Sequence, residues 1–118
     1  MNGFPSIEKL QPLIGQSVNA VNCNAYQIIF EFDTLSITCE KGFSLIDKLG
    51  AVIEIDIPLM SSDLLDLIHL KVMSVTVCEA KKCLNILFEN DEMVSFVEND
   101  SYETFTICCG EQKYIVIL

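Results

Sequence analysis

The sequence contains no arginine, no tryptophan and only one histidine, His69. Its seven lysines stand against 17 aspartates and glutamates, which gives a formal net charge of −10 over 118 residues. Proteins that bind nucleic acids need lysine and arginine against phosphate, and anionic membranes repel an acidic chain for the same reason. The composition therefore excludes both roles and favours a cationic partner protein. Acidity also keeps a chain soluble without any partner, and that alternative stays open.

Long apolar runs are missing as well. No run approaches the roughly 20 residues that a membrane helix needs. Residues 1–15 lack the basic start and the continuous apolar stretch of a secretory signal. The chain is nevertheless 51% hydrophobic, which excludes disorder. We therefore expect a single cytoplasmic domain that spans residues 1–118.

The motifs of catalytic and cofactor sites are also absent. There is no glycine-rich phosphate loop, no H-E-x-x-H and no G-x-S-x-G, and the five glycines are scattered singly. His69 follows an apolar segment and suits a helix cap better than a catalytic base. The acidic run 89–92 lacks the spacing of a calcium loop and is typical of a hairpin turn. We expect no enzyme activity, no cofactor and no metal.

The six cysteines form no C-x-x-C pair, and the lone histidine cannot complete a zinc-finger pattern with them. Most lie in apolar or alternating runs, where a free cysteine packs as a small hydrophobic residue. Because no secretion signal leads to an oxidising compartment, all six thiols are expected to be free. A metal or redox role is the alternative. The cysteines are Cys23, Cys39, Cys78, Cys83, Cys108 and Cys109.

The chain shows an internal pseudo-repeat, with halves at about 6–57 and 60–118. The tract 28–33 (IIFEFD) matches 86–91 (ILFEND), which aligns Phe30 with Phe88. Upstream, Leu13-Ile14 and Val18 recur as Leu67-Ile68 and Val72. Chance similarity between two β-rich halves is the alternative to a duplication.

Each half begins with an apolar stripe of helical spacing, followed by alternating segments typical of strands. Residues 52–57, for example, place Ile53, Ile55 and Ile57 on one face and Glu54 and Asp56 on the other. Residues 41–50 are ambiguous and could form a loop with one helical turn. The order is a helix, about four strands, a helix and about five strands. It predicts an α+β fold in which a duplicated helix-plus-strands unit forms two antiparallel sheets.

The tracts 18–40 and 72–100 resemble the Whirly-type architecture of single-strand nucleic-acid binders, although the charge has the opposite sign. A small acidic chain of this kind is similar to the immunity proteins of bacterial contact-dependent growth inhibition. This resemblance implies a Whirly-like sandwich or half-open barrel. It also implies an inhibitor that blocks the active site of a cognate basic toxin, with a ribonuclease as the expected target. No diagnostic motif allows individual functional residues to be transferred.

Carboxylates at the hairpin turns are the expected contacts with such a toxin, because turns on a rigid scaffold often carry recognition groups. If these turns are not the interface, the region around Asp63 and Asp66 is the next candidate. A small cytosolic ligand-binding or regulatory module is the alternative function. The predicted partner-binding residues are Asp33, Asp91, Glu92, Glu98, Asp100 and Glu103.

Overall fold

The computed structural model describes residues 10–40, 42–57, 63–78, 83–97, 105–109 and 112–116. These residues form strands together with two short 3-10 segments, η1 (Gln11–Leu13) and η2 (Asp63–Leu67). In the last two strands, burial is described for Ile107 alone. The strands are β1 (Ala20–Cys23), β2 (Ile28–Glu31), β3 (Leu35–Cys39), β4 (Phe43–Ile46), β5 (Val52–Ile55), β6 (Val72–Val77), β7 (Cys83–Phe88), β8 (Met93–Val97), β9 (Phe105–Cys109) and β10 (Gln112–Val116).

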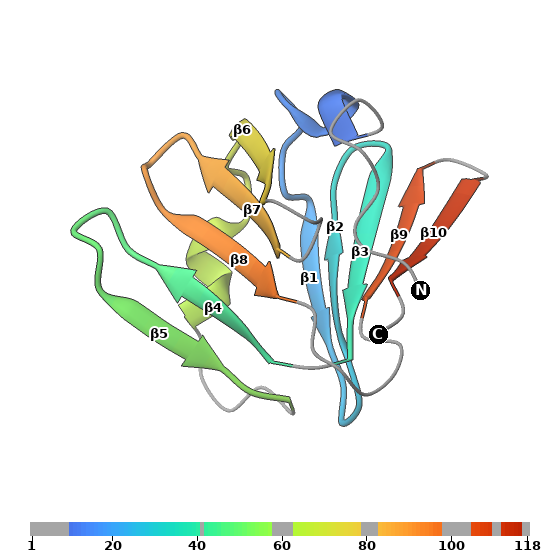
Figure 1. Cartoon of the computed structure of the whole chain (residues 1–118), viewed down its shortest axis with the longest axis horizontal. Helices are drawn as coiled ribbons and strands as arrows, with labels where there is room; N and C mark the ends of the chain where they lie inside the picture. The colour runs from blue at the N-terminus through green and yellow to red at the C-terminus, as the bar shows by residue number, and fades with distance from the viewer. Residues whose placement is uncertain are drawn as a thin grey trace.

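The strands form two antiparallel five-stranded sheets, whose strand directions cross in Figure 1. The first sheet has the order β1-β2-β3-β9-β10, and the second has the order β5-β4-β8-β7-β6. Each half of the chain thus contributes three consecutive strands to one sheet and its last two strands to the other. The chain first changes sheet between Cys39 and Phe43. A Cβ atom on Gly42 would lie 2.6 Å from the carbonyl oxygen of Ile55, so this crossing requires glycine.

The two sheets are joined where the segments that lead into β1 and β6 meet. Ser17 and Lys71 form an isolated antiparallel bridge there. These residues hold equivalent places in the two halves, since Val21 faces Phe30 between β1 and β2 and Val75 faces Ile86 between β6 and β7. The two halves thus have equivalent strand orders and meet at this bridge. Whether a duplication produced this equivalence stays a prediction.

The sequence match between the halves is shifted in the second strand. Phe30 and Phe88 both lie in the second strand of their sheet meander. Register nevertheless makes Ile86 the counterpart of Phe30, because each faces the equivalent valine across the ladder. The aligned tracts therefore identify the correct pair of strands but place them two residues out of register.

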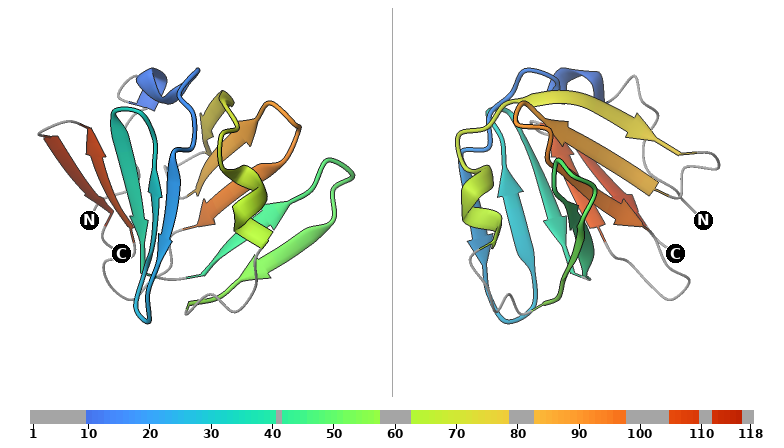
Figure 2. Two further views of the ribbon diagram at one scale, coloured as in Figure 1. Left: turned by 180° about the vertical axis from the view of Figure 1, so that it is seen from behind. Right: turned by 90° about the vertical axis from the view of Figure 1, so that its left-hand side faces the viewer.

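The core lies between the two sheets and follows the alternation of the strands. Ile28, Phe30 and Phe32 are buried, whereas Ile29 and Glu31 between them are half-buried. The other strands with described side chains supply further apolar residues, and η1 and η2 add buried leucines. Seen from behind in Figure 2, η2 lies between β1 and the β4–β5 hairpin. No helix among the described residues is long and apolar enough to span a bilayer.

The prediction of an α+β fold built from helix-plus-strands units is wrong. The described part of the chain is mostly strand, and its helical elements are 3-10 segments of three and five residues. Pro12 lies in the first turn of η1, and Gly15 follows at φ +89°. His69 ends the η2 region at φ +78°. Segments this short gain little from helix propagation, so their apolar residues are held by packing on the sheets.

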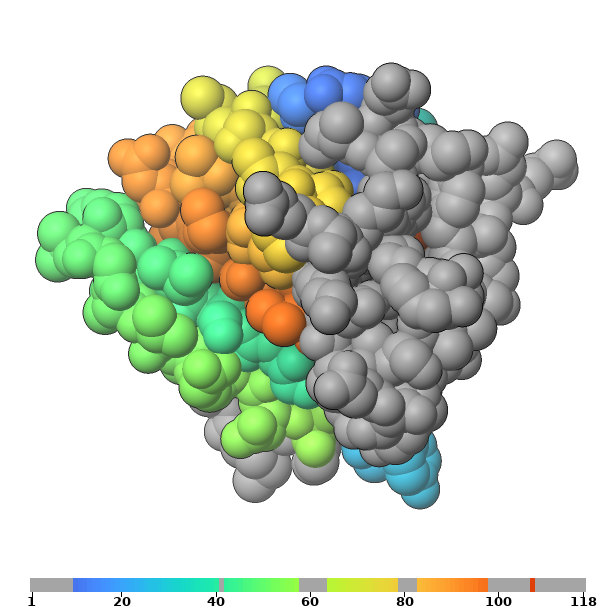
Figure 3. Space-filling model, in the orientation of Figure 1, coloured from blue at the N-terminus to red at the C-terminus, as the bar shows by residue number. Residues whose placement is uncertain are grey.

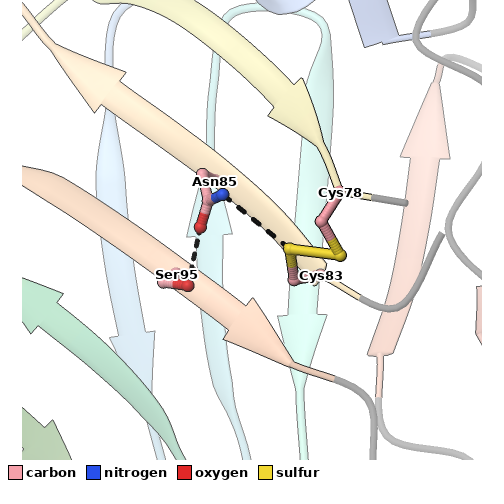
Figure 4. Close-up of a disulfide and its surroundings, with 4 residues drawn as sticks. All are labelled: Cys78, Cys83, Asn85 and Ser95. Carbon is pink, nitrogen blue, oxygen red and sulfur yellow. Dashed lines mark hydrogen bonds between the residues drawn. A yellow bond between two sulfur atoms is a disulfide. The ribbon is translucent and has the colours of Figure 1, made fainter. Parts of the chain in front are cut away.

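The prediction that all six thiols are free is also wrong, because Cys78 and Cys83 form a disulfide (Figure 4). The two cysteines face each other where β6 and β7 meet, and the Cys78 N–H donates to the Cys83 carbonyl oxygen at 3.0 Å. Their Cα atoms are 5.2 Å apart, within the usual range for a disulfide. Cys23 is free and exposed, and Cys39 is free and buried.

Candidate functional site

Three of the six predicted partner-binding residues lie in the described part of the chain. Asp33 occupies the turn between β2 and β3, and Asp91 and Glu92 occupy the turn between β7 and β8. These turns hold equivalent places in the two halves. The other predicted residues lie outside the described part: Glu98, Asp100 and Glu103.

Asp33 is exposed but tied to the scaffold. Its Oδ2 accepts the Ser17 N–H at 3.2 Å, and its Oδ1 accepts the side-chain amide of Asn19 at 3.0 Å. The next residue of the turn is also anchored. The buried Gln16 side chain accepts the Thr34 N–H at 2.9 Å and donates to the Thr34 hydroxyl at 2.7 Å. The Asp33 carboxylate is therefore held in a fixed outward position.

Glu89 is the counterpart of Asp33 in the other hairpin. Its Oε2 accepts the Lys71 N–H at 2.9 Å, and its own N–H donates to the Lys71 carbonyl oxygen at 2.9 Å. One carboxylate therefore caps each side of the Ser17–Lys71 bridge. Sequence reasoning missed Glu89, although its place beside the Asn90-Asp91 turn was a usable signal.

The turn after β7 presents Asp91 and Glu92 in different ways. Asp91 is exposed and adopts φ +70°, which aspartate tolerates better than most residues. Glu92 is half-buried, and its Oε1 accepts the Asn90 side-chain amide at 2.6 Å. The Asn90 side chain in turn accepts the Glu92 N–H at 3.1 Å. Glu92 is thus oriented by its neighbour, whereas the structure describes no such bond to the Asp91 carboxylate.

The turn after β7, which carries Glu92, borders a hollow of about 410 Å³ at one end of the second sheet. The loop between β4 and β5 forms another wall, and the two turns are neighbours at the left of Figure 1. Asp47 is fixed there, since its Oδ1 accepts the N–H groups of Leu49 and Ala51 at 2.8 and 2.9 Å. The hollow is lined by Asp47, Lys48, Leu49, Asp66, Asn90 and Glu92.

The hollow brings together carboxylates that are distant in the sequence. Asp47, Asp66 and Glu92 come from a loop, from η2 and from a hairpin turn, against one ammonium group, that of Lys48. Asp66 belongs to the alternative interface that the sequence suggested, whereas Asp47 was missed because its segment had no clear assignment. Asp33 does not line this hollow.

The described carboxylates face solvent or lie at half-buried positions. The one buried polar or charged residue in the described part is Gln16. Two lysines have described side chains, Lys48 and Lys71. Neither forms an ion pair with a carboxylate in the described part of the chain. The described residues also contain no group of three or more His, Cys, Asp or Glu side chains that could hold a metal ion. The carboxylates are Glu31, Asp33, Glu40, Asp47, Glu54, Asp56, Asp66, Glu89, Asp91 and Glu92.

Comparison with models of protein families, with curated proteins and with solved structures finds no match for this chain.

Proposed function

We propose that this protein is an immunity protein that binds a cognate basic toxin, a ribonuclease, and neutralises it by covering its active site. The observation that carries this proposal is the net charge of −10 in a chain without arginine. A ribonuclease must attract phosphate, so its active site is cationic and complements such a surface. The resemblance to contact-dependent growth inhibition immunity proteins points to the same role.

The geometry of the turns supports this proposal. The carboxylates of Asp33, Asp47 and Glu92 are each held by hydrogen bonds to nearby backbone or side-chain groups. Groups that are already ordered lose less conformational entropy when a partner binds. They would stand in place of the phosphates of the toxin's substrate. Complementary charge would also accelerate association, and salt would slow it.

The test uses the toxin encoded beside this protein, with binding kinetics and toxin inhibition measured at several salt concentrations. Asp91→Lys removes an exposed turn carboxylate and adds a charge that opposes the toxin. We expect slower association with little change in dissociation, as for charges at the rim of an interface. Glu40→Lys changes the net charge equally at an exposed site outside these turns and serves as the control.

A larger effect of Asp91→Lys than of Glu40→Lys supports contact through the turns. Equal small effects would place the interface on another face. The function itself is refuted if the parent protein neither binds nor inhibits the toxin at low salt.

We further propose a cytoplasmic location, where an immunity protein would intercept an incoming toxin. A reducing cytosol keeps most cysteine pairs as thiols. Cys78 and Cys83 therefore report on the compartment. In cells quenched with acid and alkylated, both residues should be modified, although they are bonded in the isolated protein. Protection of the pair in living cells would contradict the cytoplasmic location.

A further inference from the structure

The second sheet ends in a strand edge that no described residue covers. β5 pairs with β4 alone, and its outward backbone groups have no hydrogen-bond partner in the described part of the chain. The opposite end of this sheet is protected, because β6 has a register shift between Val72 and Ser74 and the Ser17–Lys71 bridge adjoins it. Natural proteins commonly protect edges in this way, since a free edge is a template for pairing.

The register of β5 shows which backbone groups are free. The Asp47 N–H donates to the Ala51 carbonyl oxygen at 2.9 Å, which fixes the phase of the β4–β5 ladder. Hydrogen-bonded and non-hydrogen-bonded pairs alternate in an antiparallel ladder. The N–H and C=O groups of Val52 and Glu54 therefore point to the free edge. Because the β5 register runs without a shift, these groups have the spacing that an added strand requires.

The side chains of β5 also remain accessible. Val52 is 56% exposed and Ile53 is 39% exposed, although both are β-branched residues typical of paired strands. Glu54 is exposed on the outer face, where its Oε1 accepts the Ser44 hydroxyl at 2.8 Å. Asp56 beyond the strand is exposed too. The β4–β5 hairpin forms the left margin of the surface in Figure 3.

The charges decide which strand would fit. A second copy of β5 would bring Glu54 and Asp56 close to the same carboxylates of its partner, between two chains that each carry −10. Like charges on facing strands are destabilising. A segment with alternating apolar and basic residues has the complementary pattern. Its apolar side chains would extend the Ile53 face, and its ammonium or guanidinium groups would reach Glu54.

We propose that β5 binds an extended, basic segment of a partner protein by strand addition, with Val52 and Glu54 supplying the backbone hydrogen bonds. This inference rests on the proposed function, because it takes the partner to be cationic. It adds the binding mode and the element that carries it.

The first test uses a synthetic peptide, acetyl-(Lys-Val)₄-amide, with the full-length protein. We expect amide chemical-shift changes centred on β5, and amide exchange at Val52 and Glu54 slowed about fivefold or more by the new hydrogen bonds. The effect should weaken as salt rises. The matched control, acetyl-(Glu-Val)₄-amide, should not bind. Equal binding of both peptides, or shifts centred elsewhere, would overturn the proposal.

Variants test the same edge. Val52→Pro removes an N–H that points away from β4, so it should weaken peptide binding about fivefold or more without a fall in the thermal midpoint. Val52→Ala keeps the N–H and is its control. If the proline variant does not fold, Glu54→Lys decides, because it should reverse the preference to the acidic peptide. An unchanged preference would overturn the proposal.

Two further experiments distinguish a failure of this inference from a failure of the proposed function. If Val52→Pro binds and inhibits the neighbouring toxin as the parent does, the edge proposal fails while the immunity function stands. If the parent does not bind that toxin, the function fails, and the peptide result still decides the edge. Sedimentation would overturn the proposal by showing a dimer that Val52→Pro dissociates, because the occupant would then be a second copy.

Discussion

Replacing Phe30 with alanine should remove a large part of the stability of this protein. Phe30 is 1% exposed and connects the two sheets. Its ring centroid lies 5.4 Å from that of Phe43 and 5.8 Å from that of Phe96, both in edge-to-face geometry. Phe43 and Phe96 are themselves 5.2 Å apart. One ring from the first sheet thus packs against two rings from the second, which also contact each other.

The size of the loss follows from this packing. Truncating a buried phenylalanine to alanine costs about 3–5 kcal/mol, because apolar burial is lost and a cavity remains. Each aromatic pair adds about 0.5–1.5 kcal/mol beyond its buried area. We therefore expect a loss near the upper end, about 4–5 kcal/mol, against a total stability of about 5–15 kcal/mol for a small domain. Phe88→Ala should cost about 3–5 kcal/mol, since Phe88 is equally buried.

Urea titration followed by circular dichroism measures this loss. Phe30→Leu keeps most of the volume and should cost less than Phe30→Ala. Tyr26→Ala, at a position that is 82% exposed, should change stability by less than about 0.5 kcal/mol and is the control. In a double-mutant cycle, Phe30→Ala and Phe96→Ala should couple, because the rings touch. A loss below about 1 kcal/mol for Phe30→Ala would refute the core assignment.

Three more predictions concern the scaffold and one thiol. Gln16→Ala should destabilise the protein in urea by about 1–3 kcal/mol, because the β2–β3 turn loses the acceptor of a backbone N–H; a loss below about 0.5 kcal/mol would contradict this. Gly42→Ala should lower the thermal midpoint, because the new Cβ would lie 2.6 Å from the Ile55 carbonyl oxygen; an unchanged midpoint would show that the crossing can relax. Burial raises the pKa of the Cys39 thiol well above its usual value, so little thiolate forms at pH 8. Peptide mass spectrometry of the native protein should then show iodoacetamide modification at the exposed Cys23 and not at Cys39, and the reverse order would refute this.

Much of the local structure could be read from the sequence. The alternation around Phe30 and Phe88 is typical of strands with both rings inside, and both rings are buried. Successive side chains of a strand face opposite sides of the sheet. When one side is buried, apolar residues therefore recur at every second position of the sequence, and this pattern can be recognised. The strand β4 was missed, although Phe43 and Leu45 are buried within it. Four residues give too short a pattern, and β4 is stabilised by its ladders with β5 and β8.

The helices were overpredicted for a related reason. An apolar stripe such as that formed by Leu64, Leu67 and Ile68 fits one helical turn as well as several. The sequence alone does not reveal that the sheets accept only a single short turn at this place. In the same way, the carboxylate chemistry of the hollow was visible in the composition, but its grouping was not. Asp47, Asp66 and Glu92 meet only because β4 lies beside β8 and η2 packs nearby.

The sequence by itself determined the charge, most of the strands and the residues that face the core. These properties depend on each residue's own chemistry and on neighbours one or two positions away. The tertiary structure alone decided the exchange of strands between the halves, the Cys78–Cys83 bond and the free edge at β5. The Cys78–Cys83 bond depends on the register of the β6–β7 hairpin, which makes two residues five positions apart face each other. The exchange of strands and the free edge depend on which strands pair, a choice made among segments that are far apart in the chain. Strands with similar alternation are nearly interchangeable as local patterns, so that choice depends on how the whole core packs.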